Sequence, residues 1–217
     1  MKIITVQKLF SGKSIHELPE VSDCLDKLGV GHPIDSINWA GFPGKPVIKF
    51  NIGYSDEEIF LKFYVNENCI KAEMTLSNQK VYEDSCVEFF VAPEGDRPYY
   101  NFEFNSIGTC LLGFGSDRTG RELADPDIIS KIRRLPSMGI VPFDEKRGEF
   151  FWTLIIAIPL DVFFRHEIKK LKNRSFSANY YKCGDKLSSP QYVTWNPILT
   201  ENPDYHRPEY FGMIRFE

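Results

Sequence analysis

The feature that most constrains this chain is the alternation of apolar and polar residues with a period of two. In residues 58–66, Ile59, Leu61, Phe63 and Val65 fall on one side of an extended backbone, and mostly polar residues fall on the other. This alternation is typical of β-strands that are buried on one face. Further strands are expected over residues 45–53, 85–92, 98–107, 109–114, 149–158, 174–182 and 210–216.

Helical patterns are few and short. Leucine and valine recur at helical spacing between residues 14 and 30, and Gly29 is expected to end that helix. A second short helix is expected over residues 126–135, because Pro126 suits the first helical position and Asp125 can cap it. Many strands and few helices predict an all-β fold, a jelly-roll-like β-sandwich of antiparallel sheets. The 217 residues are expected to form one domain, with residues 1–33 as an N-terminal extension packed on it.

The strands also assign side chains to faces. Residues 85–92 and 98–107 are expected to be hairpin neighbours, each with one apolar face directed to the core. Their opposite faces are more polar and carry Glu88 on the first strand and Asn101, Glu103 and Asn105 on the second. Asn179 is expected to lie on the same surface, on a third strand. Amide and carboxylate groups together suit sugar hydroxyls, but a sheet face that only contacts water has the same pattern.

Charge and cysteine content exclude several classes of protein. The net charge of −4 argues against nucleic-acid binding, and the basic run at residues 169–172 is expected to be a solvated face. No segment reaches the roughly 20 apolar residues of a membrane span. Residues 1–8 lack the apolar run of a signal peptide, so the sequence as written predicts a cytoplasmic protein, and an extracytoplasmic one if a leader has been trimmed. The five cysteines have no zinc-site spacing and are expected to be buried thiols.

Several motifs together resemble the family 9 carbohydrate-binding modules. Residues 81–91, Val-Tyr-Glu-Asp-Ser-Cys-Val-Glu-Phe-Phe-Val, resemble the family pattern of an aromatic residue, a spacer and Asp-Ser-x-Val-Glu-x-Phe. The following strand, residues 100–108, is also similar. Further similarity lies in Phe-Trp-Thr at 151–153, Ile-Pro-Leu at 158–160, Trp-Asn-Pro at 195–197 and Pro-Glu-Tyr-Phe-Gly at 208–212. The resemblance covers roughly residues 34–217.

The resemblance implies a β-sandwich that holds a sugar between two aromatic rings. The rings correspond to Tyr82 and Trp195, and the carboxylate that binds sugar hydroxyls corresponds to Glu88. Tyr82 departs from the Trp of the best-known members and offers less stacking area. Asn105, Arg118 and Asn179 complete the predicted site as our own choices of polar contact. Family members can hold structural calcium, but no calcium-ligand pattern is recognisable here, so no cofactor is expected.

The predicted function is therefore non-catalytic binding of a mono- or oligosaccharide, in association with polysaccharide breakdown. Three alternatives stay open on the sequence. A glycoside hydrolase would use Glu88 and Glu103 as paired carboxylates. A haem or redox β-sandwich would need axial ligands such as histidines, and the four histidines mostly fall in loops or helices. A protein-interaction module would use the same sheet face. His206 is either a ligand contact or a surface loop residue. The oligomeric state is not predicted.

Overall fold

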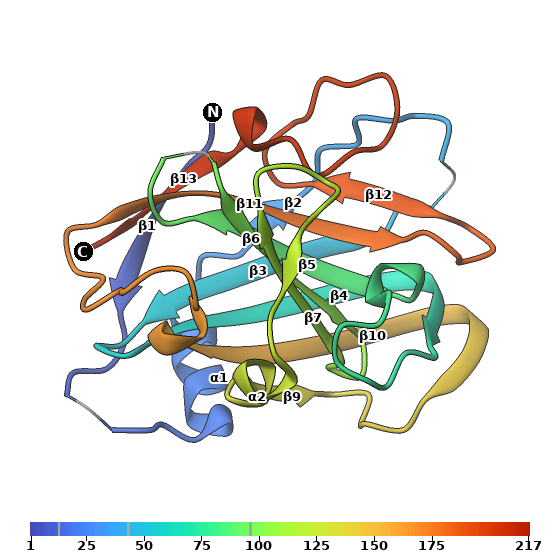
Figure 1. Ribbon diagram of the computed structural model, residues 1–217. Coiled ribbons are helices and arrows are strands. Elements are labelled where there is room, and N and C mark those ends of the chain that lie inside the picture. The colour runs from blue at the N-terminus through green and yellow to red at the C-terminus, as the bar shows by residue number, and fades with distance from the viewer. Residues whose placement is uncertain (13, 43, 96) are drawn as a thin grey trace.

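The computed structural model describes residues 1–12, 14–42, 44–95 and 97–217 (Figure 1). The helices are α1 (Leu18–Lys27) and α2 (Pro126–Ser130), with short 3-10 turns η1 (Val81–Glu83), η2 (Leu160–Val162) and η3 (Pro208–Tyr210). The strands are β1 (Ile3–Lys8), β2 (His32–Ile34), β3 (Val47–Tyr54), β4 (Glu58–Ala72), β5 (Cys86–Ala92), β6 (Tyr99–Asn105), β7 (Cys110–Gly115), β8 (Glu122–Leu123), β9 (Arg133–Pro136), β10 (Phe143–Pro159), β11 (Ser175–Gly184), β12 (Gln191–Thr194) and β13 (Gly212–Phe216).

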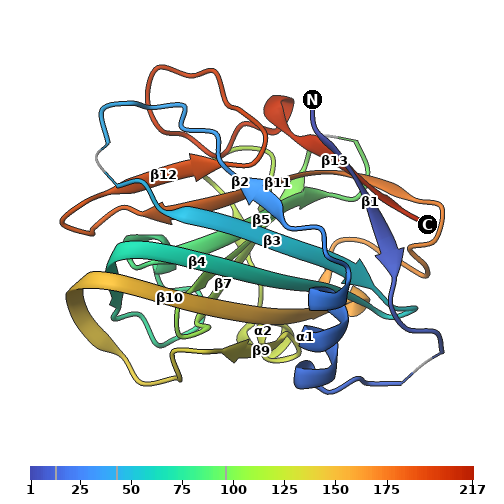
Figure 2. The same cartoon turned by 180° about the vertical axis from the view of Figure 1, so that it is seen from behind.

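The strands form two layers that β1 joins. We call the layer β8-β7-β6-β5-β11-β13 sheet A, with β12 paired to β11, and the layer β3-β4-β10-β9 sheet B, with β2 paired to β3. The first residues of β1 pair with β13, and its last two residues pair with β3, so β1 leaves one layer and enters the other. Figure 1 looks onto sheet A, and Figure 2 shows sheet B and α1 from behind. This is the expected β-sandwich.

The main core lies between the two sheets. The alternation places Val87, Phe89 and Phe102 of sheet A and Phe50 and Phe63 of sheet B in this one cluster, all without solvent exposure. Tyr180 lies among them and stacks on Phe50 and on Phe89, with ring centroids 3.8 and 5.0 Å apart. Burying each such aromatic side chain contributes roughly 1.5–3 kcal/mol. The inward faces predicted for β5 and β6 are confirmed.

A buried ion pair also connects the layers. The ammonium nitrogen of Lys182 on β11 lies 2.9 Å from a carboxylate oxygen of Glu67 on β4, and neither side chain is exposed. The Trp152 indole nitrogen donates to the other Glu67 oxygen at 2.6 Å, and Lys182 also donates to Gln191 at 2.7 Å. These hydrogen bonds offset the cost of removing both charges from water.

Helix α1 covers the outer face of sheet B. Its buried residues, Val21 and Leu25, are four apart and pack on Phe60, Ile155 and Ala157. Gly29 follows with a φ of +67°, a conformation that ends helices and suits glycine. The helix predicted between residues 14 and 30 is confirmed, with tighter bounds.

Three details of the expected fold were wrong. The sandwich is not purely antiparallel, because β1 runs parallel to both β13 and β3. Residues 1–33 are not only an outer extension, since they supply β1 to the join between the layers. The second helix ends at Ser130, and residues 133–136 instead form β9, because they pair with the edge of β10 over residues 154–157. Tertiary pairing overrides the weak helical pattern there.

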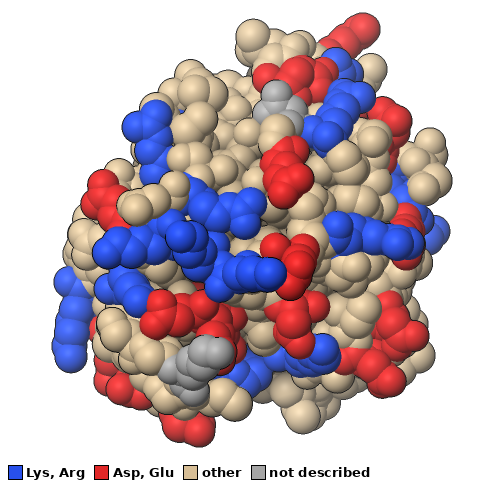
Figure 3. Space-filling model, turned by 60° about the vertical axis from the view of Figure 1, so that its left-hand side comes forward, with Lys and Arg blue, Asp and Glu red and all other residues tan. Residues whose placement is uncertain are grey.

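The sequence also made predictions about membrane spans and about the basic run at residues 169–172. Among the described residues, no helix is long and apolar enough to cross a membrane. The cytoplasmic location stays a prediction. Lys169, Lys170 and Lys172 are exposed, as expected of a solvated face. Figure 3 shows Lys and Arg side chains gathered in a band on the side that carries β1 and β13, with Asp and Glu around them.

Candidate binding pocket

A pocket of about 400 Å³ lies on the outer face of sheet A, on the side opposite the main core. The floor is formed by β5, β6 and β11, and the walls come from η1, β12 and the loops 116–121 and 203–206. The volume falls within the usual range for small-molecule sites. Loops that are distant in the sequence thus enclose a face that strand alternation alone would leave open to water.

Two carboxylates form the centre of the floor. Glu88 on β5 and Glu103 on β6 are direct register partners, so their side chains point to the same side of the sheet. Each is only 3% exposed. Glu103 accepts a 2.8 Å hydrogen bond from Asn101, and its other oxygen, Oε2, has no partner among the described residues. The Cys183 thiol donates to Glu88 at 2.9 Å. Glu103 Oε2 is therefore a buried acceptor that remains available to a ligand.

Burial changes the acidity of this pair. Burial, followed by the nearby charge of Glu103, raises the pKa of Glu88 well above its usual value. Burial likewise raises the pKa of Glu103 to about 7. Two adjacent carboxyls in a poorly solvated site do not both ionise readily, so the pair retains a proton near neutral pH. The floor can then both donate and accept hydrogen bonds, as a sugar hydroxyl does.

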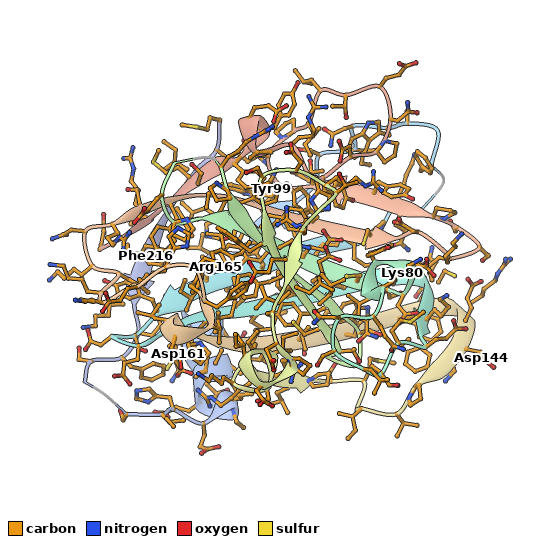
Figure 4. The ribbon with its side chains drawn as sticks, viewed as in Figure 1. Lys80, Tyr99, Asp144, Asp161, Arg165 and Phe216 are labelled. Carbon is orange, nitrogen blue, oxygen red and sulfur yellow. The ribbon has the colours of Figure 1, made fainter. Side chains whose placement is uncertain are left out.

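Arg121 holds the loop between β7 and β8 over the floor. Its Nε donates to Asn101 at 2.8 Å, and its Nη2 donates to the backbone carbonyl of Tyr99 at 2.8 Å. Its guanidinium also lies 4.3 Å from the centre of the Tyr99 ring, and Tyr99 is labelled in Figure 4. Gly113 allows this approach, because a Cβ there would lie 2.6 Å from Asn101 Oδ1. The loop is thereby fixed against β6.

Aromatic rings form one wall of the pocket. Tyr82 in η1, Phe42 and Tyr192 on β12 are all partly exposed, and the rings of Phe42 and Tyr192 meet edge to face at 4.6 Å. Asp185 hydrogen-bonds to the Tyr192 side chain, and burial raises the pKa of Asp185. These rings are exposed enough to contact a ligand and are positioned by their neighbours.

His206 closes the far end of the pocket. Its Nδ1 shares a 2.8 Å hydrogen bond with the Tyr99 hydroxyl, and its ring packs 5.0 Å from Phe90. Burial, reinforced by the charges of Arg121 and Arg118, lowers the pKa of His206 to about 3. His206 is therefore neutral in the folded protein at physiological pH. It lines the pocket and is not merely a residue of a surface loop.

The structure brings three of the six predicted site residues together. Tyr82, Glu88 and Arg118 all line the pocket. Arg118 is exposed at the rim, where its guanidinium lies 3.9 Å from Asp204. Their contact with a sugar stays a prediction.

Asn105 and Asn179 lie on the predicted face, but other parts of the chain cover them. Asn105 donates to Asp84 and to the Met74 carbonyl at 3.0 and 2.8 Å and has no exposed surface. Asn179 is also unexposed, donates to the carbonyl of Asn196 at 3.0 Å and accepts from its backbone N–H at 2.9 Å. Both side chains already have partners that order local backbone, so neither is available to a ligand.

The prediction for Trp195 was wrong. Its side chain is 2% exposed and lies in the main core, edge to face with Tyr180 at 5.5 Å and with Phe50 at 6.4 Å. A ring enclosed on both faces cannot stack on a sugar. The pocket aromatics that can contact a ligand together with Tyr82 are instead Tyr192 and Phe42. The alternative of a sheet face that only contacts water does not hold for Glu88 and Glu103, because both are buried.

Four pocket residues were not among the predicted site residues: Asn101, Arg121, Asp185 and Tyr192. Asn101 was on the predicted polar face and could have been found there. Arg121, Asp185 and Tyr192 come from loops or an edge strand, where no periodic pattern indicates direction.

A comparison with protein families places the chain. The model of carbohydrate-binding family 9 matches residues 20–216. The chain belongs to carbohydrate-binding family 9. As a member of a family of binding modules, it is a non-catalytic carbohydrate-binding protein, and this decides against the glycosidase suggested by Glu88 and Glu103.

Solved structures agree with the fold of a family 9 member. A candidate carbohydrate-binding protein from Bacteroides uniformis is 38% identical, with a TM-score of 0.94 over 100% of this chain and 99% of that one. A family 9 module from Caldicellulosiruptor kristjanssonii in complex with glucose is 15% identical, with a TM-score of 0.63 over 100% and 96% of the two chains. A family 9 module from the same organism in complex with cellotriose is 14% identical, with a TM-score of 0.57 over 100% of this chain and 94% of that one. No curated protein matches the chain in sequence.

Proposed function

We propose that the sugar binds in the pocket over β5 and β6, with one ring against Tyr82 and Tyr192 and its hydroxyls on Glu88 and Glu103. The observation that carries this is the buried Oε2 of Glu103, which has no hydrogen-bond partner in the described part of the chain, beneath partly exposed aromatic rings. A buried acceptor without a partner is costly unless a ligand or water meets it. Sugars combine an apolar ring face with hydroxyls, so they match both parts of the pocket. Arg118 supplies a further donor at the rim.

The complexes of the Caldicellulosiruptor kristjanssonii module with glucose and cellotriose suggest a neutral, glucose-type sugar as the first ligand to test. Each new hydrogen bond replaces one to water and contributes about 0.5–1.5 kcal/mol net. Ordering the ligand offsets much of that sum. We therefore expect dissociation constants in the micromolar to millimolar range, or about −4 to −8 kcal/mol.

Isothermal titration calorimetry tests the assignment with mono- and oligosaccharides that include glucose and cellotriose. Tyr82→Ala and Glu103→Gln should each weaken binding roughly tenfold or more, since each removes about 1.4 kcal/mol or more. Phe151→Ala and Glu149→Gln are matched controls, because both side chains are exposed on β10 in sheet B. The pocket is the wrong site if Tyr82→Ala and Glu103→Gln bind sugar as the unmodified protein does. The function itself is wrong if no sugar on a glycan array binds.

A further inference from the structure

We propose that Cys86, Glu88 and Cys183 form a binding site for a thiophilic divalent cation such as Zn²⁺. Each residue offers one donor atom, and these atoms all lie within 4.8 Å of one another. Cysteine sulfur and carboxylate oxygen are both ligands of Zn²⁺, which binds three or four protein ligands at about 2.0–2.3 Å. The site shares Glu88 with the proposed sugar pocket, but its test reads the bound metal directly and does not depend on sugar binding.

Strand pairing builds the site. Cys86 on β5 and Cys183 on β11 are direct register partners in antiparallel strands, so both thiols project from the same face of sheet A. Glu88 lies two residues after Cys86 and therefore projects from that face as well. The Cys183 thiol and a Glu88 oxygen are already 2.9 Å apart in a hydrogen bond. A cation there would replace the proton that these two atoms now share.

The site is open on the pocket side. Glu88 and Cys183 line the pocket, so an ion can enter from it, whereas Cys86 has no exposed surface. Glu103 faces Glu88 across the β5–β6 pair, and no residue that the structure describes hydrogen-bonds to its Oε2. A fourth tetrahedral position would therefore face the pocket, where a water molecule or the Glu103 carboxylate is the available oxygen donor.

The donor set discriminates between classes of metal. Thiolates favour Zn²⁺ and its thiophilic analogues, whereas Mg²⁺ and Ca²⁺ require oxygen donors and would not be held by two sulfurs. All three groups are buried, and burial raises the pKa of the Cys86 thiol to about 12. The metal must displace these protons, so binding should release protons to solvent. The nearby Lys182 ammonium compensates part of the negative charge of the loaded site.

The test uses the whole chain, treated with a chelator and then kept reduced. Titration with Co²⁺, read by absorbance, should give thiolate-to-cobalt charge-transfer bands and tetrahedral ligand-field bands that saturate at one ion per chain. Zn²⁺ should then displace Co²⁺ and remove both sets of bands, and Mg²⁺ should not. The absence of charge-transfer bands in the unmodified protein overturns the proposal. This result does not depend on whether any variant folds.

Variants locate the ion. Cys86→Ser and Cys183→Ser should each lower Zn²⁺ affinity by roughly a hundredfold or more, since even a partner of a ligand contributes ten- to a hundredfold. Cys110→Ser is the matched control, because Cys110 is also buried but belongs to the main core, on the face of sheet A opposite Cys86 and Cys183. Zn²⁺ binding that survives in both Cys86→Ser and Cys183→Ser, or that is lost in Cys110→Ser, assigns the metal elsewhere and overturns the proposal.

Discussion

Trp195 and Tyr82 differ in their surroundings although the sequence suggested one shared role. Trp195 fills space between the sheets beside Tyr180, whereas Tyr82 has a partly exposed ring at the pocket. We expect Trp195→Ala to lower the free energy of unfolding by about 3–5 kcal/mol, because it leaves a cavity in the core. Tyr82→Ala should cost less stability and weaken sugar binding. Denaturant unfolding and calorimetry measure the two effects. A Trp195→Ala protein of normal stability that has lost sugar binding would restore the stacking role.

His206 makes stability depend on pH. Its pKa is about 3 in the folded protein, and the unfolded chain has an ordinary histidine pKa near 6.5. The unfolded state therefore takes up the proton first, so the stability from neutral His206 is present above about pH 6.5 and is lost as pH falls toward 3. At pH 5 the loss should be about 2 kcal/mol relative to pH 7.

The His206→Gln variant isolates this effect. Gln can still hydrogen-bond to the Tyr99 hydroxyl but does not titrate. Glu88 and Glu103 have raised pKa values and act in the opposite direction as pH falls, so total stability is not informative by itself. The informative quantity is the difference in unfolding free energy between the unmodified protein and the variant. From pH 7 to pH 5 the unmodified protein should lose about 2 kcal/mol relative to the variant. An unchanged difference would mean that His206 is not held neutral by burial.

At the scale of elements, the loop between β7 and β8 depends on one side chain. Arg121 donates to Asn101 and to the carbonyls of Tyr99 and Asp117, so it fixes residues 116–121 over the pocket floor. We expect Arg121→Ala to speed amide hydrogen exchange in this loop and to weaken sugar binding roughly tenfold, because the ligand must then order the loop. Arg147→Ala is the control, since Arg147 is exposed on β10. Unchanged exchange in the Arg121 variant would show that other contacts hold the loop.

The whole molecule is a binding protein, although it holds two buried carboxyls in a pocket. Glu88 and Glu103 are direct register partners on neighbouring strands and share a raised pKa, so they resemble the acidic pair of a glycosidase. Family membership assigns them to binding. We expect no release of product during prolonged incubation with oligosaccharides, read by chromatography. Cleavage that disappears in both Glu88→Gln and Glu103→Gln would contradict this.

Much of the sandwich could be predicted because alternation is a local property of the backbone. Successive side chains of a strand point to opposite faces whatever the rest of the chain does. The inward faces of β5 and β6, and the position of Glu88 beside Glu103, follow from that rule and are confirmed. Strand β1 was missed because its pairing with β13 joins residues more than 200 positions apart.

The strand pattern could not predict which side chains on the outer face of sheet A a ligand can reach. Asn105, Asn179 and Glu88 all lie on the outer face of sheet A, yet covering segments leave only Glu88 in the pocket. Cys86 and Cys183 have no motif spacing, and only the register of β5 with β11 makes them neighbours. The sequence by itself determined which side chains share a face, because that depends on neighbouring residues. The tertiary structure alone decided which of them are covered, which meet and which a ligand can reach, because those contacts form between residues that the chain order keeps far apart.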